Sequence, residues 1–400
     1  MAPATLPHSA RQSTLRETNL GLVLKSVCAA PEPVSRAWVA ATTGMTRSTV
    51  SRLVDDLVDG GLLEEGAARL AGPGRPSIPL LPTASRVGAL GLQVNAAHVA
   101  ARLLNLRGEV LAESRSEPDL VGSEPGEGLK LLGTHIAELQ GSAPEGMRLL
   151  GAGLAVPGVV DRAGRKLLKA PNLGWTGVDP LAETSLSKAL EGIPLSLGNE
   201  ANLAAHAIAQ PRPGRAGEHA DFVYVSGEIG IGGAIVVEGH VQTGERGFAG
   251  EIGHVTYLPD GDPCPCGSRG CLERYAGRLA MIRRAGLPEG STLALLRARA
   301  AQGHEGSATA VAVAGSALGV VLAGVINVVD VSTVVLGGEI GELADELSPV
   351  VQEALRTRVM AAPYMSLQVV HDEDDIGGAT GAALVHLDAL VSNPASFLEL

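Results

Sequence analysis

The sequence Glu251-Ile252-Gly253-His254, with Cys264-Pro265-Cys266-Gly267-Ser268-Arg269-Gly270-Cys271-Leu272-Glu273 shortly after it, is the most informative stretch of this chain. It holds three of the chain's four cysteines within eight residues. Thiolates and imidazole are the ligands that zinc prefers, and three cysteines with one histidine complete a tetrahedron that leaves no position for water. The sequence therefore predicts a structural zinc loop over residues 254–271, with the ligands His254, Cys264, Cys266 and Cys271.

A disulfide and a chance cluster of buried thiols are the alternatives to a metal. Cys264 and Cys266 are too close in sequence to pair comfortably, and an intracellular chain keeps its thiols reduced. Gly267 and Gly270 supply the tight turns that a metal loop needs. The first ten residues have neither a basic start nor an apolar core, so they do not form a signal peptide, and we expect a cytoplasmic protein.

Length and composition indicate a globular α/β protein of two or three domains. The chain has 400 residues, 45% of them hydrophobic, with 52 glycines. Aromatic residues make up 2%, which argues against a lectin surface that stacks on carbohydrate. Helical segments and glycine turns separate apolar runs that predict strands covered on both faces, at Ala89–Val94, Leu149–Val156, Phe222–Val225, Ala234–Val237 and Thr333–Leu336.

One uncharged stretch, Ala308–Val329, is long enough to cross a bilayer. It has no aromatic or basic anchors at its ends. We therefore expect a helix buried between sheets and no membrane contact.

Charge is distributed unevenly along the chain. The formal net charge is −12, yet residues 1–80 carry eight Lys and Arg against seven Asp and Glu. The remainder is strongly acidic and would be repelled by nucleic acid. Any contact with DNA must therefore come from the first 80 residues.

Residues 1–80 predict a winged helix-turn-helix. Apolar residues at helical spacing give a first helix around Leu20–Val27, and Ser35 can cap a second one that runs through Ala41. After a turn at Gly44-Met45, Thr46 can cap a third helix, which Gly60-Gly61 ends. The inward side of this helix is formed by Val50, Leu53, Val54 and Leu57.

The outer side of the third helix carries short polar side chains and arginines near its N-terminus. Such residues reach phosphates and base edges when a recognition helix enters a major groove. We therefore assign DNA contacts to Arg47, Ser48, Thr49, Ser51 and Arg52. A helical hairpin used only for packing is the alternative.

Two short strands at 62–64 and 77–80 would form the wing. Its tip, Gly72-Pro73-Gly74-Arg75-Pro76, is a stiff finger that suits a minor groove, and Arg75 is its DNA contact. A plain linker is the competing interpretation.

The motifs together resemble the ROK family (repressors, open reading frames, kinases), in its transcriptional-repressor branch. They are the winged helix, Asn199-Glu200-Ala201-Asn202, Gly230-Ile231-Gly232-Gly233, the zinc-loop motif and Gly337-Gly338. The resemblance implies a two-lobed actin-like ATPase and sugar-kinase (RNase H-like) fold over residues 81–400. One lobe would take about 87–200 plus 375–400, and the other 201–374. It also implies a sugar site between the lobes formed by Asn199, Glu200, Glu251, His254 and Glu273, with Asn172 a weaker match.

Three departures from the family's kinases predict that phosphorylation is lost. Gln93-Val94-Asn95-Ala96-Ala97 replaces their Asp-x-Gly-Gly-Thr phosphate loop, and Glu228-Ile229-Gly230 replaces a second Gly-Thr-Gly turn. Side chains obstruct the approach of backbone N–H groups to phosphate, and an acid repels it. Glu200 stands where the catalytic Asp would be, so the carboxylate is displaced by about a bond length.

We therefore expect a sugar-responsive DNA-binding regulator, a repressor of carbohydrate-utilisation genes and not an enzyme. Its partners would be operator DNA and a sugar or sugar derivative, and it would act as a homodimer or a dimer of dimers on a pseudo-palindromic site. The alternatives are an ATP-dependent hexose kinase with an appended regulatory domain, and a zinc-stabilised sugar-binding module with no DNA role.

Overall fold

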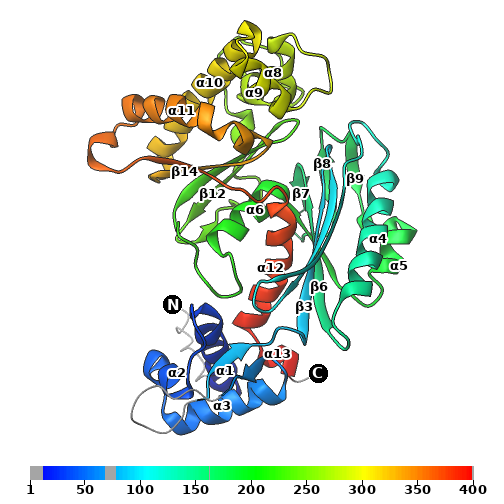
Figure 1. The fold of residues 1–400 in the computed structure, drawn as a ribbon, viewed down its shortest axis with the longest axis vertical. Helices are drawn as coiled ribbons and strands as arrows, with labels where there is room; N and C mark the ends of the chain where they lie inside the picture. The colour runs from blue at the N-terminus through cyan, green and yellow to red at the C-terminus, as the bar shows by residue number, and fades with distance from the viewer. Residues whose placement is uncertain (1–11, 68–77, 162, 399–400) are drawn as a thin grey trace, which may run out of the picture.

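The computed structural model describes residues 12–67, 78–161 and 163–398. Its first part is a three-helix module with a two-stranded antiparallel ribbon (Figure 1), made of α1 (Gln12–Ala29), α2 (Arg36–Thr43), α3 (Arg47–Asp59), β1 (Leu63–Glu65) and β2 (Leu80–Pro82). The Ser35 hydroxyl accepts from the Trp38 N–H, and the Thr46 hydroxyl accepts from the Thr49 N–H, so both predicted caps are confirmed.

The second strand of the ribbon lies further along the chain than the sequence predicted. It begins at Leu80, whose N–H donates to the Val34 carbonyl at 2.7 Å, whereas the prediction placed it at 77–80. Pro79 has no N–H to give to a ladder, which fits its position just before the strand. Arg75 and the expected wing tip lie outside the described residues.

The first large sheet has the strand order β10-β6-β3-β4-β5. Its strands are β3 (Val87–Val94), β4 (Val99–Asn105), β5 (Val110–Ser116), β6 (Arg148–Val156) and β10 (Leu195–Asn199). The pairs β3–β4 and β4–β5 are antiparallel, and the pairs β3–β6 and β6–β10 are parallel. One face packs against α4 (Pro125–Ser142) and α5 (Thr184–Ala189). A small sheet beside it consists of β7 (Val159–Val160), β8 (Leu167–Ala170) and β9 (Trp175–Val178).

The second large sheet, β13-β12-β11-β14-β15, repeats the same connectivity. Its strands are β11 (Phe222–Gly227), β12 (Ile231–Val237), β13 (His240–Val241), β14 (Thr333–Gly338) and β15 (Gln368–His371). The helices on one side are α7 (Glu273–Ala276), α8 (Arg278–Ala285), α9 (Leu293–Ala301), α10 (Glu305–Val329) and α11 (Ala344–Arg358). Two sheets with the same strand order, each covered by helices, agree with the expected α/β architecture.

Among the described residues, α10 is the one helix whose length and apolar composition would allow it to cross a membrane. Its buried face packs on α11, α8 and the β11–β14 face of one sheet. The predicted burial is found, but the expected position between two sheets was wrong. Packing inside the molecule accounts for its apolar composition.

Two helices, α6 (Glu200–Ala209) and α12 (Gly377–Ser392), pack against each other between the two large sheets (Figure 1). α12 lies on β3 and β6, and α6 lies on β11 and β12. α6 begins where β10 ends, so its first turn faces the space between the sheets.

The N-terminal module shares its core with the end of the chain. Leu20 and Leu24 of α1 belong to the same buried cluster as Leu387 and Val391 of α12, and α13 (Ala395–Leu398) packs beside them (Figure 1). Arg148 of β6 stacks over the Phe397 ring at 4.2 Å. The module is therefore fixed to the helix that runs between the two sheets.

Candidate functional site

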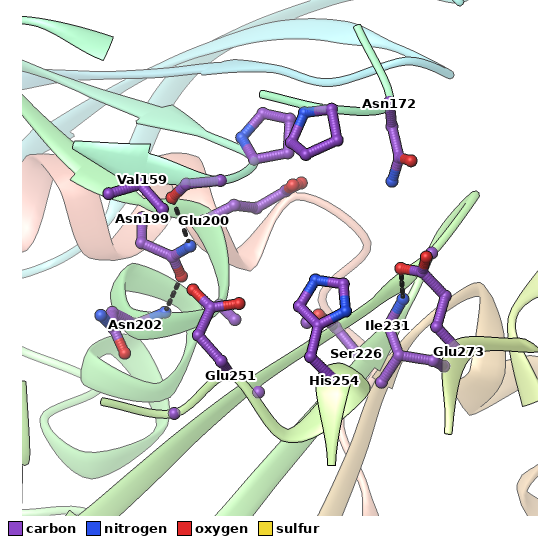
Figure 2. A pocket seen from close by; sticks show the side chains of 18 of the residues that line it. Val159, Asn172, Asn199, Glu200, Asn202, Ser226, Ile231, Glu251, His254 and Glu273 are labelled. Carbon is purple, nitrogen blue, oxygen red and sulfur yellow. Dashed lines mark hydrogen bonds between the residues drawn. The ribbon is translucent and has the colours of Figure 1, made fainter. Parts of the chain in front are cut away.

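A cavity of about 110 Å³ opens where the ends of β6 and β10 face the turn between β11 and β12. All the side chains expected to bind a sugar line it, namely Asn199, Glu200, Glu251, His254 and Glu273, and so does the weaker match Asn172 (Figure 2). The structure thus brings together these six side chains from four separate segments of the chain.

Glu200, at the first position of α6, is held by two amides of the segment that ends β3. Its Oε1 atom accepts from Gln93 Nε2 at 2.6 Å and from Asn95 Nδ2 at 2.8 Å. Burial raises the pKa of Glu200 to about 7, and the bonds from Asn95 and Gln93 act in the opposite direction. A carboxyl with this pKa can change its charge near neutral pH.

The Asn95 side chain also satisfies the backbone that follows it. Its Oδ1 atom accepts from the N–H groups of Ala97 and His98, each at 2.9 Å. These are the N–H groups that an anion at this loop would need. The side chain of the loop occupies them instead.

Asn199 and Asn202 act on the N-terminus of α6. Asn199 Oδ1 accepts from the Asn202 N–H at 3.1 Å, and Asn199 Nδ2 donates to the Gly158 carbonyl at 2.9 Å. Asn199 therefore caps the helix and fixes the loop after β6, in addition to lining the cavity. Asn202 was not predicted as a site residue, although its spacing of three residues from Asn199 places both on one helix face.

The Asn202 Oδ1 atom is buried and has no hydrogen-bond partner within the described part of the chain. Ser226, at the end of β11, is another cavity residue that the sequence did not single out. A buried acceptor without a partner is destabilising by itself, so a ligand hydroxyl that donates to Asn202 would remove that penalty.

The Glu273 side chain lines the cavity next to Gly230. Its Oε2 atom accepts from the Ile231 N–H at 3.2 Å. A Cβ atom on Gly230 would lie 2.1 Å from that oxygen and 2.8 Å from Asn172 Nδ2. The absence of a side chain at Gly230 therefore leaves room for both Glu273 and Asn172 beside this turn.

Glu251 lies on the exposed rim of the cavity. Partial burial raises its pKa, His254 lowers it and Glu273 raises it again. The residues next to it, Gly247, Ala249 and Gly250, form one wall. Glu251 and Glu273 thus offer carboxylate acceptors to the cavity, with His254 between them (Figure 2).

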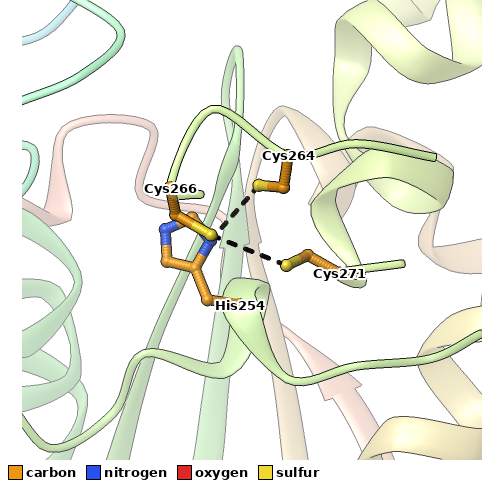
Figure 3. A group of neighbouring side chains, drawn as sticks. All are labelled: His254, Cys264, Cys266 and Cys271. Atoms are coloured by element: carbon orange, nitrogen blue, oxygen red, sulfur yellow. Dashed lines mark hydrogen bonds between the residues drawn. The ribbon is translucent and has the colours of Figure 1, made fainter. Parts of the chain in front are cut away.

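The expected metal ligands meet in one place. One nitrogen of His254 and the sulfurs of Cys264, Cys266 and Cys271 all lie within 4.8 Å of one another (Figure 3). The Cys266 and Cys271 sulfurs are 3.8 Å apart, as are the Cys264 sulfur and His254 Nδ1. Ligands at zinc–sulfur distances of about 2.3 Å in a tetrahedron stand about 3.8 Å apart, so the set fits such an ion.

The cysteine loop is a tight hairpin that also borders the cavity. The Cys264 N–H donates to the Ser268 carbonyl at 2.9 Å, and Gly267 and Gly270 have φ values of 100° and 68°, as the expected turns require. Pro265 and Cys266 line the cavity together with His254. A metal held here would fix one wall of the cavity.

The outer face of α3 is open to solvent. Arg47, Ser48 and Arg52 are exposed, and Thr49 and Ser51 are partly exposed. The inward residues Val50, Leu53, Val54 and Leu57 are buried as predicted. The five polar side chains therefore share the free face of the second helix of a helix-turn-helix.

Two acids further along α3, Asp55 and Asp56, form ion pairs. Arg36 NH1 donates to Asp55 at 2.6 Å and its NH2 to Glu65 at 2.8 Å, while Arg16 pairs with Asp56 at 3.1 Å. No local pattern in the sequence predicted these pairs. They reduce the negative charge that would otherwise oppose a nucleic acid beside this helix.

Comparisons with known proteins agree with this architecture. The sequence pattern of the ROK family matches residues 89–389, which is most of the chain. The chain belongs to the ROK family. A second pattern, that of the MarR family, matches residues 22–72, so this ROK protein carries a MarR-type helix-turn-helix ahead of the ROK domain.

Among curated relatives, the xylose repressor of Caldicellulosiruptor bescii is 33% identical over 271 residues, or 67% of this chain. The match spans 66% of the length of that relative. The DNA-binding transcriptional dual regulator NagC of Escherichia coli is 26% identical over 88% of this chain and 87% of its own.

A solved structure shows the same fold over nearly the whole chain. It is that of a ROK family transcriptional regulator described as a homolog of the E. coli MLC protein. The TM-score is 0.76 at 23% identity, and the likeness covers 96% of this chain and 100% of the other. The expected fold, a winged helix-turn-helix followed by a sugar-kinase-like ROK domain, is confirmed.

Proposed function

We propose that this ROK protein is a sugar-responsive DNA-binding repressor of carbohydrate-utilisation genes, with a DNA-binding module over 1–80 and an effector domain over 81–400. One observation carries the proposal: the same chain contains a polar cavity lined by carboxylates and amides and an exposed polar face on α3. The names of the xylose repressor and NagC support it.

In the cavity, a sugar would be held through its hydroxyl groups. Carboxylates and amides form charge-assisted hydrogen bonds with vicinal hydroxyls. We assign this role to Asn199, Glu200, Glu251, His254 and Glu273, with Asn172 and Asn202 beside them. His254 would use Nδ1 for the metal and leave Nε2 for the ligand.

For the metal we propose zinc in a structural role. The donor set of one imidazole and three thiols is the one that closes a tetrahedral zinc site. Because Cys266 and His254 also line the cavity, the ion would keep that wall in place without taking part in chemistry.

We infer that the protein is not a kinase. In the loop after β3, the Asn95 side chain accepts hydrogen bonds from the N–H groups of Ala97 and His98. A phosphate bound at this loop would need those same N–H groups. Glu200, in place of the family's catalytic Asp, is bonded by Gln93 and Asn95. That arrangement supports a binding role and argues against the hexose-kinase alternative.

On DNA, the α3 face would enter a major groove, with Arg47, Ser48, Thr49, Ser51 and Arg52 facing bases and phosphates. Arg75 would act from the wing. A homodimer or a dimer of dimers would place two such helices on a pseudo-palindromic operator, in the cytoplasm. Sugar binding would change the operator affinity by favouring one relative arrangement of the two DNA-binding modules of the dimer.

The test is a selection of the full chain against a random pool of duplex DNA, followed by fluorescence anisotropy on the selected site. We expect an enriched inverted repeat whose affinity changes at least about fivefold with one sugar of a monosaccharide panel. Failure to enrich any sequence would contradict the DNA role. Formation of ADP that depends on a sugar would restore the kinase alternative.

A further inference from the structure

The helix α6 has one end at the cavity assigned to the sugar and the other end at the N-terminal module. Its first residues, Glu200, Ala201 and Asn202, line the cavity. Ala207, in its last turn, packs against the buried cluster that α1 shares with α12. A short helix without glycine or proline moves as one rigid piece, so a displacement of its first turn also displaces its last.

A single aspartate of α12 joins this last turn to the loop that follows it. Asp388 Oδ2 lies 3.0 Å from His206 Nε2, and Asp388 Oδ1 accepts from the Gly214 N–H at 2.9 Å. Within the described part of the chain, the bond from His206 to Asp388 is the hydrogen bond that joins α6 to α12. The two side chains are 17% and 18% exposed, so water competes little for this bond.

The loop after α6 extends the connection to α1. It folds back on the helix, with the Gly217 N–H donating to the Ala209 carbonyl at 2.8 Å. Gly214 in this loop has a φ of 70°, and a Cβ atom there would lie 3.5 Å from Lys25 Cγ and 3.6 Å from Cys28 Cβ. The loop therefore lies next to α1 at the residue whose N–H is held by the aspartate of α12.

Near its middle, α6 crosses α12 with no side chain between the two backbones (Figure 1). A Cβ atom on Gly381 of α12 would lie 1.8 Å from the Leu203 carbonyl oxygen. α12 in turn rests closely on the first large sheet, because a Cβ atom on Gly91 of β3 would lie 1.8 Å from the Ala379 carbonyl oxygen. The crossing is thus a fixed point between the two ends of α6, and a rotation of the helix about it displaces both ends.

We propose that Asp388 is a positioning residue that couples sugar binding to operator binding. It ties the last turn of α6 to the Gly214 loop, so that a shift of α6 caused by a sugar at its first turn reaches α1. The inference rests on the proposed function and names the connection through which its two sites influence each other. Without this tie, each site keeps its own affinity, and the effect of one ligand on the other falls.

The test measures the coupling between the two sites. Anisotropy titrations of the full chain on its selected operator, with and without the sugar found in the panel, give the factor by which the sugar changes operator affinity. We expect this factor to be at least about fivefold in the wild type and below about twofold in His206→Ala and Asp388→Ala. The sugar affinity of the DNA-free protein, measured by calorimetry, should stay within about twofold of the wild type, because neither side chain lines the cavity.

Two further variants separate coupling from stability. Asp388→Asn keeps an oxygen for the Gly214 N–H and gains an amide that can donate to His206, so it should retain most of the factor. His386→Ala removes the hydrogen bond of 3.0 Å between His386 Nε2 and Ser196 Oγ, elsewhere on α12. This control should lower the thermal midpoint and leave the factor unchanged.

The possible outcomes distinguish the proposal from the function on which it rests. A wild-type factor in His206→Ala would overturn the proposal, and so would an equal loss in His386→Ala, because the loss would then follow stability. If Asp388→Ala fails to fold, His206→Ala and Asp388→Asn still decide. Wild-type protein that binds no sugar, or whose operator affinity no sugar changes, would instead overturn the proposed function.

Discussion

Gln93 Nε2 donates to Glu200 Oε1 at 2.6 Å, across 107 residues of the chain. Gln93 is the last residue but one of β3, and Glu200 is the first residue of α6. The same glutamine accepts from the Ala379 N–H at 2.9 Å through its Oε1 atom. One side chain thus joins the starts of α6 and α12, the two helices that lie between the sheets.

The raised pKa of Glu200, about 7, predicts a pH-dependent stability. The folded state takes up this proton more readily than the unfolded chain, so the contribution to stability is complete below about pH 4.5 and is lost as pH rises through 7. Relative to Glu200→Gln, the wild type should lose up to about 1.4 kcal/mol of unfolding free energy per pH unit between pH 5 and 7. Denaturant unfolding of both proteins over this range measures the difference, and a difference that does not vary with pH would contradict the prediction.

The cysteine cluster should hold one zinc ion per chain. Cys266→Ser removes a thiolate ligand, so metal content and the thermal midpoint should both fall. Cys28→Ala provides the control, because Cys28 is buried in α1 outside the cluster and its loss should leave zinc at one per chain. Elemental analysis of protein purified without chelator decides, and wild-type protein without zinc would refute the site.

Sugar affinity should depend on the carboxylates of the cavity and not on ATP. Glu251→Ala or Glu273→Ala removes a charged acceptor worth roughly 1.5–3 kcal/mol, which corresponds to about ten- to a hundredfold in affinity. Glu245→Ala changes an exposed glutamate of the neighbouring loop and should have little effect. Calorimetry with the sugar identified in the panel measures these affinities, and unchanged binding in both cavity variants would rule out the assigned contacts.

Operator affinity should depend on the exposed face of α3. Arg47→Ala should weaken binding by about 1–3 kcal/mol and reduce sequence preference, whereas Arg356→Ala, an exposed arginine on the ROK domain, should not. For the wing, Arg75→Ala should weaken binding most on AT-rich flanks. Anisotropy titrations at physiological salt test all three, and wild-type affinity in an Arg47/Arg75 double alanine variant would refute the DNA role of this region.

The shared core predicts that α12 stabilises the N-terminal module. Leu387 is fully buried in the cluster that contains Leu20 and Leu24, so Leu387→Ala should destabilise the protein by about 2–5 kcal/mol. Val385→Ala on the same helix, where the side chain is 39% exposed, should have a much smaller effect. Denaturant unfolding measures both, and equal effects would show that α12 is not part of the core of the module.

Much of the fold could be predicted from local patterns. Ser35 and Thr46 marked two helix starts, and the apolar runs at 89–94, 149–156 and 333–336 marked three strands of the large sheets. The ribbon strand at Leu80 was misplaced, because its start depends on pairing with Val34, which is distant in sequence. The helix α10 was recognised by its composition, but its packing partners were not.

The sequence by itself predicted the helix-turn-helix, several strands, a set of one histidine and three cysteines with metal-ligand spacing, and a loop at 93–97 without the expected glycines, because caps, periodicity and ligand spacing act over a few residues. Only the tertiary structure decided that Gln93 and Asn95 hold Glu200, that Asn202 leaves a buried acceptor at the cavity, and that α12 completes the core of the N-terminal module. These relationships join side chains from distant segments. They depend on how whole helices and sheets pack, which no local pattern of residues specifies.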